Sequence, residues 1–362
     1  MTRRILTLSI AIGVLATNIF AQLPRIVVEG NGAPQVFTDF TAAVAAAQPN
    51  DKVYLSGGSF PYIGGLVIDK TLHLIGAGTH PDSTQVTSVT SLVMTTTPAP
   101  LRITTAASGS TFTGIRFTST YTNGNTDLIR YGTSTADDLP TDIIFQRCQF
   151  DLNVYLGFNS GTVSSPEATV FNECYFASRL VGESRGAVVT RCIFDPDGSG
   201  YYAISGFDSG PLLMENCVLL GSIMANCYSA VVRNCISTAT NYICYDCTNS
   251  TFTNNVVAAP VVVSTSPGVT LSNNIVDADP ATYFVSETDD LYQYTDDLHM
   301  APGSPGVAYG TDGTDLGIYG TSSPYKPGAV PYNPHYRQAS IATATDANGD
   351  LPVTINVATQ PN

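Results

Sequence analysis

Residues that could do acid–base chemistry are few in this sequence and lie far apart. The lysines are Lys52, Lys70 and Lys326, and there are only four histidines. Three pairs of adjacent acids stand beside Thr, Leu or Tyr in apparent loops: Asp137–Asp138, Asp289–Asp290 and Asp296–Asp297. Neighbouring residues on an extended chain point in opposite directions, so such a pair seldom brings two carboxyls together. We therefore expect these acids to be solvated turn residues.

Two short segments place oxygen ligands at alternating positions around a glycine turn, as calcium loops do. One is DPDGSG at 195–200, with Asp195 and Asp197 as ligands, and the other is DANGD at 346–350, with Asp346, Asn348 and Asp350. Neither has the later acidic ligand that completes an EF-hand-type loop. We expect a turn at each, and calcium is the only cofactor that the sequence leaves open.

One pattern recurs eight times between Phe112 and Asn274. It is an apolar residue, two mostly polar ones, then usually Cys or Asn at a position that we call the slot, and then usually an apolar residue two positions later. The slots fall at 115, 148, 174, 192, 217, 235, 255 and 274. A period of roughly 20 residues indicates stacked coils. The copies are rich in strand formers and no helical periodicity is visible between 100 and 297, so the coils should consist of short strands.

Offsets from the slot assign the faces of each coil. Residues three before and two after the slot are apolar and should point into a tube, whereas the residue just before it is mostly Gly or Asn, which tolerate the positive φ of a tight corner. The position two before the slot forms an outward polar stripe: Thr113, Gln146, Asn172, Thr190, Glu215, Arg233, Thr253 and Ser272. Glu215 and Arg233 should be neighbours on adjacent coils. We expect a surface ion pair, with an acid or base site as the alternative.

Five of the eight cysteines occupy slots, stacked one coil apart: Cys148, Cys174, Cys192, Cys217 and Cys235. Their side chains should run parallel, so we expect free thiols that fill space in the core. Cys227 and Cys247 should form another stacked pair, in line with Ser184, Ser209 and Ser266. Cys244 and Cys247 spell a lone CxxC, which is weak evidence for zinc or redox chemistry without a second Cys or His pair.

The paired asparagines at 254–255 and 273–274, the Cys and Asn ladder, and an entry segment with one helix resemble the pectin-lyase-like superfamily. The resemblance covers residues 34 to 320 and implies an all-β fold, a right-handed parallel β-helix with a short N-terminal capping helix. That helix falls within residues 37–60, begins after a Thr or Asp cap and ends at Pro49. It would plug one end of the tube.

Four segments are expected along the chain. Residues 1–21 have two arginines, an apolar run and a plausible cleavage site after Ala21, as a secretory signal peptide does. Residues 22–60 form the N-terminal capping segment, 61–320 the β-helix, and 321–362 a C-terminal tail that packs on it. We expect export to the periplasm, the cell surface or the extracellular space, without a transmembrane anchor.

The charge balance excludes one class of partner. The chain has 15 basic and 29 acidic residues, and the signal holds Arg3 and Arg4 but no acid, so the mature balance is −16. Nucleic acid binding is therefore not expected. Such a surface suits neutral glycans better than polyanions.

Relatives implied by the resemblance include pectate lyases, polygalacturonases, pectin methylesterases and alginate or chondroitin lyases. A lyase needs a base such as Lys or Arg, and no coil carries a lysine. Hydrolysis in the polygalacturonase manner needs clustered aspartates with a Gly-His-Gly motif, which none of the four histidines provides. The long steps between early slots instead predict loops that could bind glycan. The ligand-binding candidates are Tyr121, Tyr131, Asp137, Asp138, Gln146, Tyr155 and Asn172.

Two apolar columns should also face outward. The first column, one position after the slot, consists of Tyr175, Ile193, Val218, Ile236, Val256 and Ile275. The second column, four positions before the slot, consists of Ile144, Val170, Val188, Leu213 and Val231. Apolar columns of this length need a cover, either the tail or a surface partner such as a second copy in lateral self-association. Together the patterns predict a secreted or cell-surface β-helix protein that is structural or glycan-binding and not catalytic. The alternative is a polysaccharide lyase or glycosidase with Glu215 and Arg233 as its weak catalytic candidates.

Overall fold

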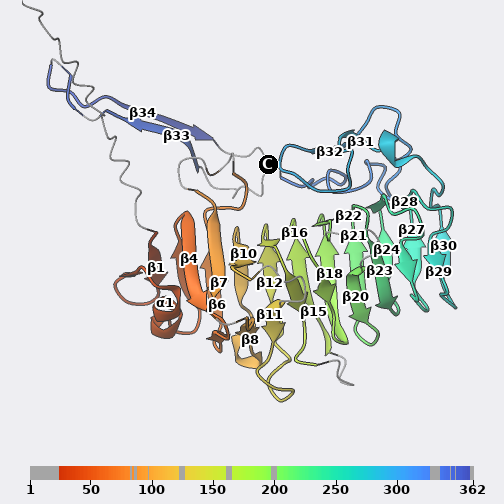
Figure 1. Ribbon diagram of the computed structural model, residues 1–362, viewed down its shortest axis with the longest axis horizontal. Coiled ribbons are helices and arrows are strands. Elements are labelled where there is room, and N and C mark those ends of the chain that lie inside the picture. The colour runs from red at the N-terminus through yellow and green to blue at the C-terminus, as the bar shows by residue number, and fades with distance from the viewer. Residues whose placement is uncertain are drawn as a thin grey trace, which may run out of the picture.

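The structure, a computed structural model, describes residues 24–81, 84, 88–96, 98–121, 127–159, 165–196, 202–326, 335–342, 344–346 and 348–358. The proposed signal peptide and the calcium candidate Asp197 lie outside these residues. The chain winds into a right-handed parallel β-helix with three faces, so the predicted fold class is confirmed (Figure 1).

Each coil contributes one strand to each of three sheets, which we call A, B and C. Sheet A runs β2 (Gln35–Phe37), β1 (Ile26–Glu29), β3 (Asp51–Leu55), β6 (Leu72–Ile75), β9 (Thr111–Thr113), β12 (Ile144–Gln146), β15 (Ser165–Asn172), β18 (Arg185–Thr190), β21 (Leu212–Glu215), β24 (Val231–Arg233), β27 (Thr251–Thr253) and β30 (Thr270–Ser272). Sheet B runs β4 (Gly58–Ile63), β7 (Thr90–Thr95), β10 (Arg116–Ser119), β13 (Gln149–Phe150), β16 (Tyr175–Phe176), β19 (Ile193–Phe194), β22 (Val218–Leu219), β25 (Ile236–Ser237) and β28 (Val256–Val257). Sheet C runs β5 (Val67–Ile68), β8 (Leu101–Ile103), β11 (Asp127–Tyr131), β14 (Asn153–Tyr155), β17 (Leu180–Val181), β20 (Tyr202–Phe207), β23 (Ile223–Cys227), β26 (Cys244–Tyr245) and β29 (Val263–Ser264).

The corner between sheets A and B lies where the repeat predicts it. All eight residues that precede a slot have φ between 51° and 65°, in the left-handed region. Gly and Asn are the residue types that tolerate this region best, yet Arg147, Glu173 and Arg191 adopt it too. The stacked backbone therefore imposes the corner whatever the residue type. Asn and Gly lower the conformational energy of the positive φ, but the corner forms without them.

The core is a tube filled by the residues on either side of this corner. Residues three before and two after the first seven slots are buried, as the offsets predict, whereas Leu271 and Val276 of the last coil are exposed. Their rings stack from coil to coil, with centroids 4.7 Å apart for Phe112 and Phe145 and 4.6 Å apart for Phe176 and Phe194. This stack of aromatic side chains positions the outward faces of all three sheets.

The N-terminal end of the tube is closed. Helix α1 (Phe40–Ala46) begins after Asp39, whose Oδ1 accepts a hydrogen bond from the Ala42 amide at 2.7 Å, and it buries Phe40, Ala43 and Val44. Strands β1 and β2 pair antiparallel at the same end. The predicted capping helix is therefore present within its predicted segment.

Residues 278–326, which we call the covering segment, lie over sheet B. They contain the short 3-10 helix η3 (Pro280–Thr282) and the antiparallel pair β31 (Phe284–Ser286) and β32 (Asp297–Met300), seen beside β22 and β28 in Figure 1. Leu298, Leu316 and Ile318 are buried against the apolar column that follows the slots. The parallel coils thus end near residue 276, earlier than the predicted 320. Most of the cover precedes the predicted tail at 321–362, of which residues up to 326 take part, with Tyr325 buried in the same cluster.

The second apolar column, four residues before the slots, stays at the surface of sheet A. Ile144 is 38% exposed and Val231 is 39% exposed. Farther along the chain, β33 (His335–Ile341) and β34 (Val353–Ala358) form an antiparallel hairpin that pairs with no other described strand. A short 3-10 helix, η2 (Thr105–Ala107), completes the elements of the coils.

Candidate functional site

The predicted polar stripe runs along the outer face of sheet A. Its eight residues are aligned by the parallel register from Thr113 to Ser272. Arg233 Nε lies 2.9 Å from Glu215 Oε1, and the Arg233 side chain is 42% exposed. Each of these charged groups has the other as its partner on an open face. The pair is the surface ion pair that the sequence predicts, and no further charged group joins it in the described contacts.

The glycan-binding candidates are not brought together. Gln146 and Asn172 lie on sheet A, and the Asn172 amide oxygen accepts a hydrogen bond from the Thr190 hydroxyl at 2.9 Å. Tyr155 lies on sheet C, whereas Tyr121 follows β10 and packs partly buried against the core. Tyr131 is a correction to the prediction, because it is buried at 2% exposure and its hydroxyl meets Thr169 at 2.8 Å.

Asp137 and Asp138 point in different directions, as expected for neighbours, but only one is a solvated turn residue. Asp137 accepts hydrogen bonds from the Thr133 hydroxyl and the Ser134 amide at 2.7 and 2.8 Å. Asp138 is buried and accepts from Arg185 Nη2 at 2.9 Å. It also accepts from the Phe158 amide at 3.0 Å. Asp138 therefore holds the loops together and presents no carboxylate to a ligand.

Charged and aromatic side chains do converge on the outer face of sheet C. We call this group the sheet C cluster. It consists of Arg102, Asp127, Arg130, Tyr155, Phe158 and Glu183. Its members come from β8, β11 and β14 and from the connections that follow β14 and β17. Four successive coils therefore build one site.

A β-bulge in β11 makes the cluster possible. The register to β14 shifts between Asp127 and Ile129, and both Leu128 and Ile129 are buried. In a regular strand, residues three apart face opposite sides of the sheet. The extra residue of the bulge turns Asp127 and Arg130 to the same side. Sequence periodicity could not find this pair, and no residue type in DLIRY marks the bulge.

Arg130 is the centre of the cluster. Its Nε and Nη2 donate to Asp127 Oδ2 at 3.0 and 2.9 Å, and its Nη1 donates to the Phe158 carbonyl at 2.6 Å. The guanidinium carbon lies 4.0 Å from the centre of the Tyr155 ring. Glu183 Oε1 lies at 3.9 Å from Nη1. This arginine is locked in place, and it aligns a ring and two carboxyls around it.

Partial burial shifts the protonation of both carboxyls. Burial raises the pKa of Asp127 above its usual 3.8, although the Arg130 charge opposes the shift. Burial likewise raises the pKa of Glu183 above 4.5, again against Arg130. Glu183 has a φ of 47°, so a left-handed backbone holds it over the cluster. The site combines a fixed cation, a ring and acids that protonate more readily than free ones.

The remaining metal and redox candidates have structural partners. Cys244 and Cys247 are joined in a disulfide, with Cα atoms 6.1 Å apart, whereas the slot cysteines are free and buried. Asp195 Oδ2 accepts a hydrogen bond from the Tyr292 amide at 2.6 Å and so anchors the covering segment. Among the described residues no group of three His, Cys, Asp or Glu could hold a metal ion.

The second calcium candidate is a hydrogen-bonded turn. Asp346 Oδ1 accepts from the amides of Asn348 and Asp350 at 2.8 and 2.9 Å. That oxygen is thus engaged with the backbone of its own loop, as in an Asx turn.

No family model matches the chain, and no curated protein matches its sequence. In the described part of the chain no helix is both long and apolar enough to cross a membrane.

Proposed function

We propose that this chain is an exported β-helix protein that binds a neutral polysaccharide at the sheet C cluster without cleaving it. The observation that carries the proposal is the locked Arg130, which lies on Tyr155 and between Asp127 and Glu183. Sugars are bound by aromatic rings beside planar hydrogen-bonding groups, and both are preorganised here.

Binding is favoured over catalysis by the way the cluster is satisfied. Asp127 is engaged by two nitrogens of Arg130, and the third nitrogen is engaged by the Phe158 carbonyl. The Arg130 charge stabilises the ionised form of Asp127 and so lowers its basicity, which weakens this carboxylate as a general base. With equal numbers of acids and arginines, the cluster attracts a neutral glycan more readily than a polyanion.

The resemblance to the pectin-lyase-like superfamily supports a polysaccharide as the ligand class. That superfamily presents polysaccharide sites on the outer faces and loops of the same parallel β-helix. Fold alone does not transfer an activity, so the residues of the cluster carry the proposal.

One observation favours an enzyme as the second candidate. Glu183 has a raised pKa and its nearest described cationic atom, on Arg130, is 3.9 Å away. A carboxyl of this kind could act as a general acid in a glycosidase or lyase. The two candidates differ in whether Glu183 is needed for turnover.

The test measures binding and product release on one panel of neutral and acidic polysaccharides. We expect wild type to bind a neutral member, and Tyr155→Ala to weaken binding about tenfold, because a cation–ring contact of ~1–2 kcal/mol is lost with the ring. Tyr245→Ala is the matched control, since Tyr245 lies farther along the same face of sheet C and should not matter.

Reducing-end and unsaturated-product assays separate the candidates. We expect no product from wild type. Turnover that is lost in Glu183→Gln would establish the enzyme instead, and turnover lost in Glu215→Ala or Arg233→Ala would move the site to sheet A. Binding that Tyr155→Ala leaves unchanged would contradict the sheet C cluster as the site.

A further inference from the structure

The two ends of the tube differ. Helix α1 and the antiparallel strands β1 and β2 close the N-terminal end. At the other end the sheets stop at β28, β29 and β30, and none of these pairs with a further strand in the described part of the chain apart from the single bridge of Val256 to Ile275. A terminal coil without a cap leaves both its core and its backbone hydrogen-bonding groups exposed.

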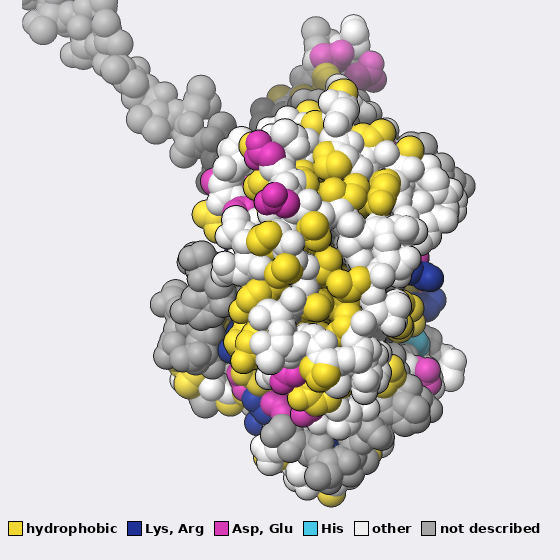
Figure 2. All heavy atoms as spheres, turned by 90° about the vertical axis from the view of Figure 1, so that its right-hand side faces the viewer, with side chains coloured by type: hydrophobic (Ala, Val, Ile, Leu, Met, Phe, Trp, Pro, Cys, Tyr) yellow, Lys and Arg dark blue, Asp and Glu magenta, His cyan; other side chains and the backbone are white. Residues whose placement is uncertain are grey.

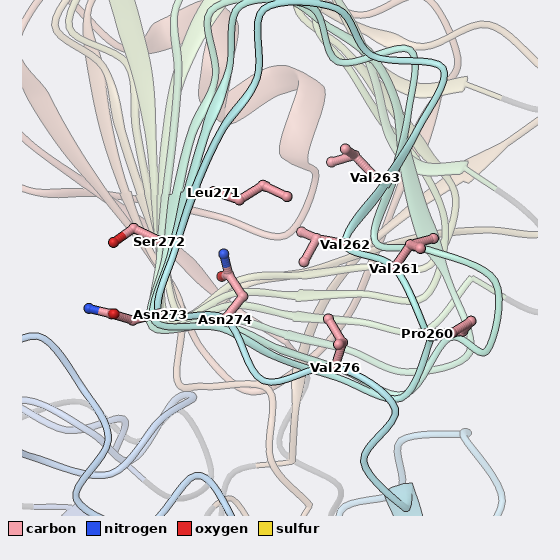
Figure 3. Close-up of a pocket in the computed structure, with 9 residues that line it drawn as sticks. All are labelled: Pro260, Val261, Val262, Val263, Leu271, Ser272, Asn273, Asn274 and Val276. Atoms are coloured by element: carbon pink, nitrogen blue, oxygen red, sulfur yellow. The ribbon is translucent and has the colours of Figure 1, made fainter.

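The open end is apolar and hollowed. A depression of about 460 Å³ is lined by Val261, Val262, Val263, Leu271, Asn274 and Val276, among others (Figure 3). Figure 2 views this end of the molecule and shows hydrophobic side chains gathered across it. Leu271 occupies the inward row of sheet A but is 51% exposed, because no later coil covers it. The cut end of the core is therefore open to an incoming apolar strand.

Charge distinguishes this end from the rest of the surface. The chain has a net charge of −14, but residues 251–276 contain no Asp, Glu, Lys, Arg or His. Residues 351–362, which include β34, contain none either. These two uncharged surfaces can meet without the repulsion that opposes contact between other faces of two acidic molecules.

The hairpin of β33 and β34 matches the open end in shape and chemistry. Val353, Ile355 and Val357 alternate along β34, so they share one face, and they are 49%, 52% and 51% exposed. Among the described strands β34 pairs only with β33, so its other edge is open to a further strand. A two-stranded hairpin gains stability when it joins a larger sheet.

We propose that the open end binds the β33–β34 hairpin of a second copy by strand addition. β34 pairs with the free edge of β30, one of its three apolar side chains continues the inward row that Leu271 ends, and the other two cover the apolar residues that line the open end. Figure 1 shows the hairpin clear of the coils on the side of β4 and α1, away from β29 and β30. It is therefore offered to a neighbour and not to the end of its own tube.

This contact is heterologous, so it extends the assembly. Each copy has one donor hairpin and one acceptor end, and a head-to-tail contact of this kind builds linear chains unless the rotation closes a ring. The closed N-terminal end excludes simple stacking of one tube on the next. Assembly through the hairpin leaves the outer face of sheet C free.

The experiment uses the full chain with single substitutions of exposed residues. Ile355→Asp disables the donor, Leu271→Asp disables the acceptor, and Val36→Asp in β2 is the matched control at the closed end, where Val36 is 58% exposed. Sedimentation velocity over a range of protein concentrations measures the size of the assembly. Ile355→Ser and Leu271→Ser repeat the test with milder changes, should either aspartate variant fail to fold.

We expect wild type and Val36→Asp to form dimers and longer chains as concentration rises, and each disabled variant alone to remain a monomer. A mixture of the two disabled variants should form a dimer that does not grow, because one good end and one good hairpin remain. Hydrogen exchange of wild type should show protection of β30 that is lost on dilution.

Three results would overturn the proposal. A wild type that stays monomeric at every concentration, with β30 protected, would mean that the hairpin closes its own tube. Association that survives in Ile355→Asp would mean that open ends contact each other. A mixture of disabled variants that stays monomeric would exclude strand exchange between copies.

Discussion

At the scale of single residues, the slots show why Cys and Asn share one position. The amides of Cys174, Cys192 and Cys217 each donate to the sulfur of the next slot at 3.4 Å. The amide of Cys235 donates instead to Asn255 Oδ1 at 2.9 Å. Sulfur thus takes the role of an amide oxygen, beyond the space-filling role that the sequence suggests. Each Cys or Asn in a slot links its coil to the one before it.

The ladder predicts that a slot without hydrogen-bonding groups is destabilising. Asn255 is fully buried, and its Nδ2 donates to the Val232 carbonyl at 3.1 Å. Asn255→Leu would remove the bond to that carbonyl and leave the buried Cys235 amide without its acceptor, so we expect a loss of about 2–4 kcal/mol in the free energy of unfolding. Urea denaturation measures it. Thr253→Val, on the outer face of the same coil, is the control and should change little; equal losses in both would contradict the ladder.

Two ion pairs of similar length should differ sharply in what their loss costs. Arg185 Nη2 lies 2.9 Å from Asp138 Oδ2 with side chains 6% and 2% exposed, whereas Arg233 is 42% exposed. Arg185→Leu strands a buried carboxylate and should cost about 3–5 kcal/mol. Arg233→Leu should cost less than about 1 kcal/mol, because water solvates Glu215. Denaturation of both variants in parallel checks the contrast, and similar losses would contradict it.

Glu183 should make stability depend on pH. Its pKa is raised by burial above the unfolded value of 4.5, so its favourable contribution is complete below pH 4.5 and is lost as the pH rises through the folded value. Glu183→Gln should therefore gain stability relative to wild type from pH 4.5 upward. Asp312→Asn is the control, because the Thr314 hydroxyl lowers the pKa of Asp312 below 3.8 and its effect should be constant in this range. Urea denaturation across the range decides; a constant difference for Glu183→Gln would contradict the shift.

At the scale of elements, the covering segment explains a second role of the corner asparagines. Asn216 Nδ2 donates to the Gly317 carbonyl at 3.2 Å, Asn234 Nδ2 to the Thr311 hydroxyl at 3.0 Å, and Asn254 Nδ2 to the Tyr309 carbonyl at 2.7 Å. The positive φ of the corner explains why these three residues are asparagines. Their side-chain hydrogen bonds explain how the covering segment is held over sheet B. The asparagines thus hold the cover in register with the apolar column.

Removal of one anchor of the cover should destabilise the protein and expose that column. Leu316 is 1% exposed and packs against sheet B. We expect Leu316→Ala to cost about 2–5 kcal/mol, the usual range for a buried leucine. Dye binding to exposed apolar surface should rise with the loss. Val307→Ala is the control in the same segment, since Val307 is 43% exposed; the same response in both would contradict the cover.

Local pattern predicts the coils well because each strand repeats the same offsets. The corner, the inward rows and the stripe of Glu215 and Arg233 follow from residue types at fixed distances from the slot, and the capping helix follows from its own cap residue and Pro49. The sheet C cluster depends on a bulge and on the two connections that follow β14 and β17, whose paths are set by tertiary contacts. The apolar column of sheet B predicts that some segment covers it. The sequence does not show that residues 278–326 are that segment, because they lack the repeat.

At the scale of the whole molecule, the charge is spread over the sides of the tube and is missing from one end. The sides carry the ion pairs of sheets A and C, whereas residues 251–276 carry no charge. A tube with charged sides repels its neighbours laterally and leaves contact along its axis as the favourable direction. Lateral self-association, which the sequence suggests for the apolar columns, is the less favourable geometry for sheet B because its column is already covered.

This charge distribution predicts how axial association should respond to salt. Copies with a net charge of −14 repel one another until their uncharged surfaces meet, and salt screens that repulsion. The Debye length falls from roughly 30 Å at 0.01 M to about 8 Å at 0.15 M ionic strength, while burial of apolar surface is not screened. Association of wild type should therefore strengthen over this range in sedimentation velocity at fixed protein concentration. Leu271→Asp should stay monomeric throughout, and weaker association of wild type with added salt would show that ion pairs hold the copies together.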